Sequence, residues 1–493
     1  MEYVMGIDLG TSSVKAVVMG RDGQVTAAAG REYPVLRPRE GYGIQDPLEW
    51  WAGTKEVIRR AVDLGGILPG QIKAIGFSGQ MHGLTALDGR GRPVMPAMIW
   101  EDQRSEKEGQ EILELVRRNG LEKELMNRPV AGMMICSLLW VKKNLPDIYR
   151  NIAHVLLPKD YIRYRLGGGF DTDETDAGGS LAFSVRDRRW CGRLLEALDI
   201  REDLFPEVRK PYDIVGQMTA KAAEETGLTE GTPLAAGGAD SAMQLTGNGI
   251  VEEGTLCCNI GTASQILAAS RVPLYDRELR TQTFCHSVPG LWYTQCGSLN
   301  GGNGLRWLKK DVLKTEDSYE KLSQLAGTVE PGSGGLLFLP YLAGERTPYQ
   351  APHARGAFLG LSLTQGQTHM VRSVMEGVAM NLRQCYELFP AMGLEGHQSM
   401  VVSGGGARSG TWRQILADVF NLPVYRTTVR EEACTGAAFM AAVALGWYPS
   451  AREAARHVVR REEEPAAPVS GHVEVYCKMR ERFNRGYEAV RFL

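Results

Sequence analysis

The chain has 493 residues, of which 43% are hydrophobic and 23% charged, with a formal net charge of -2. This length is enough for two or three domains with cores of their own. The balanced charge gives no basic excess, so we expect no nucleic-acid partner. No apolar run could cross a bilayer and the chain begins a strand almost at once, so we expect neither a membrane span nor a signal peptide.

Nine cysteines are scattered along the chain without a C-x-x-C pair. An odd number of cysteines flanked by apolar residues is typical of small buried side chains in a reducing compartment. We therefore expect a cytoplasmic protein.

The first stretch of the chain predicts a β-hairpin with polar groups in its turn. Residues 4–19 read as strand, turn and strand, and the turn has the sequence D-L-G-T-S-S. A carboxylate at the end of a buried strand can supply charge for Mg²⁺, and free amides and hydroxyls can hold a phosphate. We therefore take Asp8 as a metal candidate and Thr11, Ser12 and Lys15 as phosphate donors. An ordinary hairpin explains a single match of this kind equally well.

A second copy of this pattern begins about half a chain later. Residues 258–267 again read as strand, Gly-Thr turn and strand, with Asn259 in the place of Asp8. Gly261 and Thr262 are the corresponding donors. Two such hairpins predict a duplicated α/β fold whose two lobes face each other across a cleft. The first turn keeps the acid and the second keeps only hydrogen-bond donors. This difference fits a nucleotide that is bound between the two lobes.

Strands alternate with helical patterns through the chain, which indicates α/β lobes. A helix start is marked at residues 46–49, where Asp, Pro and Glu occupy the cap and the first turn. We place the N-terminal lobe at residues 1–247 and the C-terminal lobe at residues 248–493. From about residue 447 the second lobe continues as a helical tail.

Two polar loops of the first half are candidates for binding a sugar. The loop after an apolar strand at residues 72–77 contains Met81 and His82, at the strand end where open α/β sheets bind ligands. A lone histidine is more often structural, but the flanking glutamine and glycines favour hydrogen bonding to a polyol. Trp100 and Asp102 follow another apolar stretch, and an aromatic ring with an acid suits a sugar. A surface helix start explains that second segment nearly as well.

Asp240 is the candidate for a general base. A strand of small residues from position 234 runs into G-G-A just before it, and this lack of bulk lets a ligand approach the carboxylate closely. Such a carboxylate can take the proton of a sugar hydroxyl as the hydroxyl attacks phosphorus. A helix N-cap is the alternative role, and geometry permits both roles together.

Two glycine-rich turns of the second half are candidates for nucleotide contacts. The first, which contains Gly304, enters a helix, and helix N-termini bind anions. In the second, between a strand and a helix, the backbone at Gly405, Gly406 and Ala407 could approach a nucleotide. A lone near-match to G-x-G-x-x-G is a weak signal, and the P-loop motif does not occur.

Taken in this order, these segments resemble the FGGY carbohydrate kinase family of the actin-like ATPase superfamily. The resemblance covers nearly the whole chain and is specific because all the motifs occur in one order. The segments that carry it are residues 6–11 (GIDLGT), 79–83 (GQMHG), 100–104 (WEDQR), 157–161 (LPKDY), 339–348 (LPYLAGERTP), 356–376 and 404–409 (GGGARS). It implies a duplicated actin-like, ribonuclease H-like fold with two lobes around a central cleft.

The resemblance implies an ATP-dependent sugar kinase that works with Mg²⁺. The chain is most similar to the branch of the family that phosphorylates D-xylulose to D-xylulose 5-phosphate. A kinase for another pentulose such as ribulose, for a polyol, or for a sugar acid such as gluconate is the alternative. The implied partners are the sugar and ATP, with no nucleic acid and no membrane, and the resemblance allows a homodimer.

The same resemblance implies roles for the candidate residues. It implies Asp240 as the base on the terminal hydroxyl, with Asp8 and Asp240 near Mg²⁺. The expected sugar contacts are Met81, His82, Trp100, Asp102, Asp240 and Ser241. The expected nucleotide contacts are Thr11, Ser12, Lys15, Gly261, Thr262, Gly304, Gly405, Gly406 and Ala407. The branch usually has Asn where this chain has Ser241 and Lys where it has Ser137, so we expect the sugar preference to depend on position 241.

Two other classes of protein fit parts of the sequence. A non-catalytic sugar sensor on the same fold would carry a DNA-binding helix pair or lack the base, and neither is seen. A nicotinamide-dependent oxidoreductase would use the glycine run at residues 404–406 as a Rossmann turn, but it would leave the two Gly-Thr hairpins unexplained.

Overall fold

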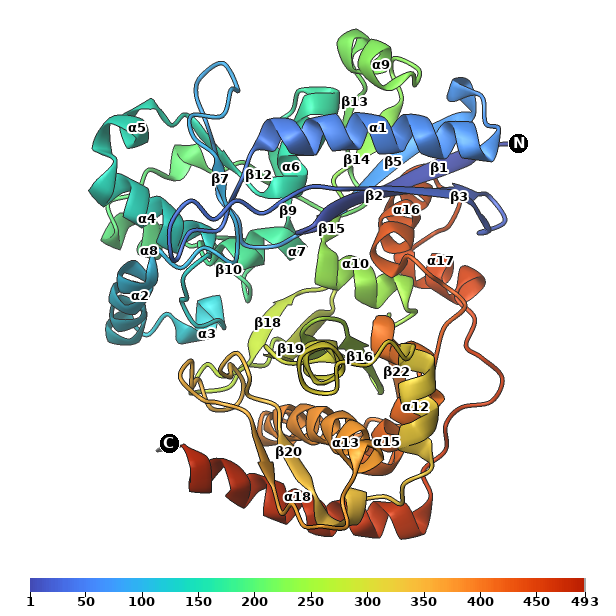
Figure 1. Ribbon diagram of the computed structural model, residues 1–493. Helices are drawn as coiled ribbons and strands as arrows, with labels where there is room; N and C mark the ends of the chain where they lie inside the picture. Colours follow the sequence, from blue (N-terminus) through green and yellow to red (C-terminus); the bar gives the residue numbers. More distant parts are fainter. Residues whose placement is uncertain (492–493) are drawn as a thin grey trace.

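Two β-sheets with matching strand arrangements form the centres of the two lobes in the computed structural model, which describes residues 1–491 (Figure 1). The strands of the first sheet are β1 (Tyr3–Leu9), β2 (Ser13–Gly20), β3 (Val25–Glu32), β5 (Ile72–Gly79), β13 (Ile214–Gln217), β14 (Pro233–Ala235) and β15 (Gly238–Ala239). Those of the second are β16 (Thr255–Ile260), β17 (Ser264–Ser270), β18 (Gln282–Cys285), β19 (Trp292–Ser298), β22 (Ser399–Ser403) and β23 (Val424–Tyr425).

The strand order repeats between the sheets. Read in the same direction, β3-β2-β1-β5-β14 of the first sheet corresponds to β19-β17-β16-β22-β23 of the second, while β13 and β18 are additional edge strands. Each sheet has an antiparallel hairpin, β1-β2 or β16-β17, whose first strand also pairs in parallel with a later strand, β5 or β22. The duplicated α/β fold predicted from the two hairpins is confirmed.

Helices cover both faces of the first hairpin, and the burial of β1 follows from this. Its residues at positions 3, 5, 7 and 9 join the core under α1 (Pro47–Gly65), whereas Val4 joins the core formed with α16 (Glu432–Ala444). Alternate side chains of a strand point to opposite faces, so both faces are apolar. The predicted start of α1 is present: Asp46 accepts a hydrogen bond from the Leu48 N–H at 2.9 Å, and Pro47 is the first helical residue.

Two helices, α10 (Asp240–Gly247) and α16, fill the space between the sheets, as Figure 1 shows. Although α16 comes from the second half of the chain, its backbone lies directly on the first sheet. A Cβ atom at Gly6 or Gly76 would lie 1.9 Å from a carbonyl oxygen of α16, that of Cys434 or Ala437. Only glycine allows such an approach. The core of the first lobe therefore includes residues from both halves.

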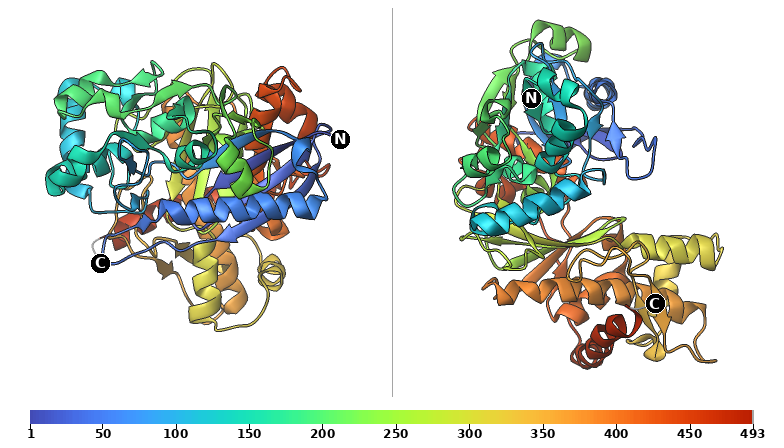
Figure 2. Two further views of the ribbon diagram at one scale, coloured as in Figure 1. Left: turned by 90° about the horizontal axis from the view of Figure 1, so that it is seen from above. Right: turned by 90° about the vertical axis from the view of Figure 1, so that its left-hand side faces the viewer.

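The remaining helices extend the lobes outward. The first lobe carries α2 (Glu106–Asn119), α4 (Met134–Asn144) and α8 (Gly192–Ala197) beyond its sheet, and the second carries α13 (Gln367–Tyr386), α15 (Gly410–Phe420) and α18 (Ser470–Val490), as both views of Figure 2 show. The predicted tail contains α17 (Ala451–Val458) and α18. Across residues 1–491, every helix is too short or too polar to span a bilayer.

Replacing Gly76 by alanine should destabilise the protein by about 1 to 3 kcal/mol, because the new methyl group would overlap the Ala437 carbonyl and push α16 off the sheet. Gly89→Ala is the matched control, since no atom lies within 4 Å of a Cβ there. Urea unfolding of both variants measures the difference. Equal stabilities would show that the helix and sheet are not in this close contact.

Candidate active site

Sheet pairing brings two aspartates of the first lobe together. Asp8 lies near the end of β1, opposite Ser78 of β5, and its Oδ1 atom accepts a hydrogen bond from the Ser78 Oγ at 2.7 Å. The short strand β15 pairs with the end of β5, with Ala239 opposite Gly79. Asp240 follows as the first residue of α10. The carboxyl ends of three strands thus meet at one place, where α/β sheets bind ligands.

Burial perturbs the pKa values of both acids. Burial, followed by the negative charge of Asp8, raises the pKa of Asp240 to about 7. Burial also raises the pKa of Asp8, against the hydrogen bond from Ser78 and the charge of Lys15. A carboxylate with a pKa near neutrality is suited to general-base catalysis. Asp240 also accepts hydrogen bonds from the Ser241 N–H at 2.6 Å and from the Ser241 hydroxyl at 3.2 Å, so Ser241 orients the base.

His82, in the loop after β5, is held in a defined neutral form. Its Nδ1 lies 2.7 Å from the Gly179 carbonyl oxygen, which can only accept, so Nδ1 carries the proton and Nε2 keeps a lone pair. Burial lowers the pKa of His82 to about 4; the Gly179 hydrogen bond opposes this and the positive charge of Arg346 adds to it. His82 can therefore accept a hydrogen bond from a sugar hydroxyl.

The second lobe also contributes to this region, which the sequence analysis did not anticipate. The Tyr293 hydroxyl of β19 lies 4.0 Å from the Met81 sulfur, and the Phe284 ring of β18 lies 6.0 Å from that of His82. Arg346 comes from the loop at 340–348, which we had singled out only as a motif. Tyr293 had no sequence signal, because it lies within an ordinary apolar strand.

Trp100 and Asp102, two residues apart, have different environments. The Trp100 Nε1–H donates to the Thr11 hydroxyl at 2.8 Å, and Trp100 lines a cavity of about 490 Å³ formed by residues of both lobes. Asp102 is fully buried, and its oxygens accept hydrogen bonds from the Arg104 side chain and the Gly43 N–H. The structure thus keeps Asp102 away from the cleft, with no free oxygen for the sugar contact that we had expected.

The phosphate candidates of the first hairpin remain at the surface of the turn. Thr11 is partly buried and Ser12 is exposed. Lys15 is half-buried and forms an ion pair of 2.8 Å with Glu431, the residue just before α16. Its ammonium group therefore already has a carboxylate partner from the second half of the chain.

A cavity of about 890 Å³ lies against the second hairpin. Four of the predicted nucleotide contacts line it: Gly261, Thr262, Gly405 and Gly406. The glycine run is needed there because Gly404 has a φ of 78°, and a Cβ atom on it would lie 2.6 Å from the Asn259 Oδ1.

Two other predicted contacts do not line this cavity. Ala407 is 4% exposed and packs in the hydrophobic core of the second lobe. Gly304 is buried in α11 (Gly302–Trp307), where it faces Val374 and Phe338 of the same core. Its neighbours in the chain line the cavity instead. We had assigned both residues from the motif, but the motif does not show which side of the backbone faces the ligand.

The acid pair fits a magnesium ion that is shared with a phosphate. Residues 1–491 contain no cluster of three or more acidic, histidine or cysteine side chains that could hold a metal by themselves. Mg²⁺ is usually bound by one or two carboxylates together with substrate phosphates and water. Asp8 and Asp240 supply such carboxylates, and the positive charge would relieve their repulsion.

Comparisons with known proteins agree with this arrangement. The chain matches the FGGY family of carbohydrate kinases, with the N-terminal domain over residues 3–247 and the C-terminal domain over residues 256–445. It is 34% identical to the xylulose kinase of Bacillus subtilis over an alignment of 501 positions, which covers 100% of this chain and 98% of the relative. It is 29% identical to the gluconokinase of that organism over 459 residues, which span 90% of this chain and 88% of the relative. The crystal structure of xylulose kinase from Rhodospirillum rubrum, 28% identical, matches with a TM-score of 0.90 over 99% of both chains.

The duplicated lobes are thus those of an ATP-dependent sugar kinase with an actin-like fold. The chain belongs to the FGGY family of carbohydrate kinases. The fold, the family and the enzyme class predicted from the sequence are confirmed.

The buried neutral state of His82 predicts a pH dependence of stability. Its pKa of about 4 lies below the ordinary value of 6.5, so the unfolded chain binds more protons between these values. The contribution is fully present above pH 6.5 and is lost as the pH falls toward 4. Between pH 7 and pH 5, urea unfolding should show a loss about 1 to 3 kcal/mol smaller in His82→Asn than in the wild type. Equal losses would contradict this account.

Proposed function

We propose that this kinase transfers the γ-phosphoryl group of ATP to the terminal hydroxyl of D-xylulose, giving D-xylulose 5-phosphate and ADP. Its greater identity to a xylulose kinase than to a gluconokinase favours this sugar. The observation that carries the chemistry is Asp240, a half-buried carboxylate with a pKa of about 7 beside the first phosphate hairpin.

In this mechanism Asp240 accepts the proton of the attacking hydroxyl. The hydroxyl oxygen forms a bond to the γ-phosphorus as the bond to the β-phosphate oxygen breaks, and ADP leaves with that electron pair. Met81, His82 and Trp100 would hold the sugar, and the Nε2 atom of His82 would accept from one of its hydroxyls. Catalysis then depends mainly on position and charge.

Magnesium would be held by Asp8 and Asp240 together with the nucleotide phosphates. When bound, the ion supplies positive charge that neutralises the phosphates and the developing negative charge. Thr11 and Ser12 of the first turn and Gly261 and Thr262 of the second would donate to those phosphates. Gly405 and Gly406 would contact the adenosine in the cavity of the second lobe.

Asp240→Asn should bind both substrates but lose at least about 100-fold in kcat, because the amide keeps the shape and has no basic oxygen. Asp102→Asn is the control, because Asp102 is an aspartate of the same lobe that is fully buried and bound to Arg104 instead. It should lower the melting temperature and leave kcat within a few-fold. Coupled ADP-release assays and calorimetry measure both. If Asp240→Asn turns over at a near-normal rate, the base is another group.

Ser241 should influence the choice of sugar, since it adjoins the base and has a shorter side chain and fewer hydrogen-bonding groups than asparagine. Wild type and Ser241→Asn should be compared with xylulose, ribulose, glycerol and gluconate. We expect the highest kcat/KM with xylulose and a changed ratio between the two pentuloses in the variant. A preference of the wild type for gluconate or ribulose would overturn the proposed substrate. An unchanged ratio would separate Ser241 from the sugar pocket.

The homodimer remains a prediction, which sedimentation velocity of the purified chain tests.

A further inference from the structure

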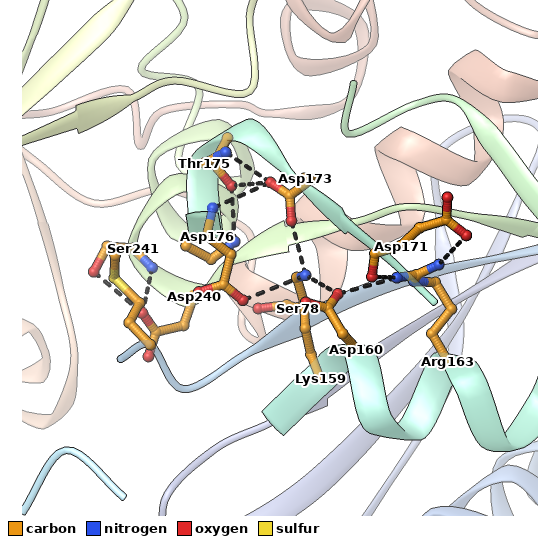
Figure 3. A network of polar contacts seen from close by, with 12 residues as sticks. Ser78, Lys159, Asp160, Arg163, Asp171, Asp173, Thr175, Asp176, Asp240 and Ser241 are labelled. Carbon is orange, nitrogen blue, oxygen red and sulfur yellow. Dashed lines mark hydrogen bonds and ion pairs between the residues drawn. The ribbon is translucent and has the colours of Figure 1, made fainter. Parts of the chain in front are cut away.

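Figure 3 shows a cluster of buried charges around Lys159. The ammonium group of Lys159, on α6 (Pro158–Gly167), lies 2.6 Å from Asp160, 2.7 Å from Asp173 and 3.3 Å from Asp176. All four side chains are 1% exposed or less. In the sequence this lysine belongs to the LPKDY motif, and it has no part in the proposed phosphoryl transfer.

Burying so much charge is costly, and apolar packing would stabilise the fold as well or better. Asp176 shows that cost: burial raises its pKa well above the usual range, and neither of its oxygens has a hydrogen-bond donor other than the lysine contact. Lys159 itself stays charged, because the three carboxylates raise its pKa against the effect of burial. A cluster retained at such a cost calls for a role beyond packing.

Hydrogen bonds connect this cluster to the residue before the base. Asp173 accepts from the Thr175 N–H at 2.8 Å and from its hydroxyl at 2.5 Å. The Thr175 hydroxyl oxygen in turn accepts from the Ala239 N–H at 2.9 Å. Ala239 directly precedes Asp240, so two hydrogen bonds join Asp173 to the backbone that carries the base.

The ion pair fixes the direction of these hydrogen bonds. Asp173 receives Lys159 on one oxygen and the Thr175 N–H on the other, so it acts as an acceptor at both. The Thr175 hydroxyl must then donate to Asp173, which leaves its oxygen lone pairs for the Ala239 N–H. The hydroxyl cannot rotate away without leaving two buried groups unpaired.

The packing around these atoms leaves little room for movement. A Cβ atom at Gly238 would lie 2.7 Å from the Thr175 hydroxyl oxygen, and one at Gly79 would lie 2.8 Å from the Lys159 Cβ. Gly238 belongs to the two-residue strand β15, and Gly79 ends the strand before the Met81–His82 loop. The cluster therefore supports both the base and the sugar loop from behind.

We propose that Thr175 is a positioning residue, held by Asp173 and Lys159, that fixes the Ala239 N–H and thereby the position of the Asp240 carboxylate. This inference rests on the proposed role of Asp240 as the base. Thr175 does not itself touch the sugar or the nucleotide. Its hydroxyl keeps the first turn of α10 in place during phosphoryl transfer.

Thr175→Val is the sharpest test, because valine has almost the same shape and lacks the hydroxyl. We expect kcat to fall about 10- to 100-fold, since small displacements of a catalytic group have effects of this size. The KM for ATP should change less than about twofold, because the nucleotide cavity is formed by the second lobe. Thr175→Ser, which keeps the hydroxyl, should restore kcat to within a few-fold.

Thr172 provides a matched control. It is a buried threonine of the same segment, on β9 (Asp171–Asp173), and its hydroxyl has no hydrogen-bond partner. Thr172→Val should therefore leave kcat within about twofold of the wild type. If Thr175→Val fails to fold, Thr175→Ala against Thr175→Ser makes the same comparison, because both lack the methyl group and only serine keeps the hydroxyl.

Several outcomes would overturn the proposal. A Thr175→Val enzyme that is less stable but has a normal kcat per folded molecule would make the hydroxyl a purely structural group. The same conclusion would follow if Thr172→Val and Thr175→Val lost kcat equally, or if Thr175→Ser did not restore kcat. It would also follow if Thr175→Ser folded and neither Thr175→Val nor Thr175→Ala did. If Asp240→Asn is inactive while Thr175→Val is normal, this inference fails and the proposed base stands. If Asp240→Asn is active, the base assignment fails.

Discussion

The parallel pairing of β5 with both β1 and β15 is the constraint on which the site depends. It places Ser78 opposite Asp8 and Gly79 opposite Ala239, so the residues that follow the strands emerge side by side. Asp8 and Asp240 are more than two hundred residues apart in the chain, and only this pairing brings their carboxylates close enough for one charge to raise the pKa of the other. The glycines at the helix contacts serve the same end, because they let α16 lie directly on this sheet.

The duplication gives the two lobes the same frame and different chemistry. Asp8 pairs with Lys15 across its hairpin and with Ser78 on the next strand, whereas Asn259 pairs with Gln265 and Ser403 at the equivalent places. The acidic copy faces the region where charge would develop. The neutral copy borders the cavity of the second lobe, in which a polyphosphate would be repelled by a carboxylate.

Electrostatics in the first lobe are arranged in two layers. The acids at the strand ends have raised pKa values, and Asp240 has no positive partner among the causes of its shift, which brings its pKa near neutral pH. The layer behind them is a buried ion-pair cluster in which Lys159 is in contact with three carboxylates (Figure 3). Asp8 and Asp240 are suited to catalysis, and the ion-pair cluster around Lys159 is suited to keeping them in position.

The sequence by itself determined the features that depend on neighbouring residues. Both hairpins, the capped start of α1 and the position of Asp240 after a run of small residues follow from local strand, cap and glycine preferences, and the order of the motifs identified the family. Tertiary structure alone decided which side of each segment faces the cleft. It directed Asp102 toward Arg104 and Ala407 into the core. It also brought two residues of the second lobe to the sugar loop, Tyr293 to Met81 and Arg346 to His82. It also joined Thr175 to Ala239. Apart from the local Asp102–Arg104 pair, these contacts link residues far apart in the chain, and the packing of helices and sheets that sets them leaves no local pattern in the sequence.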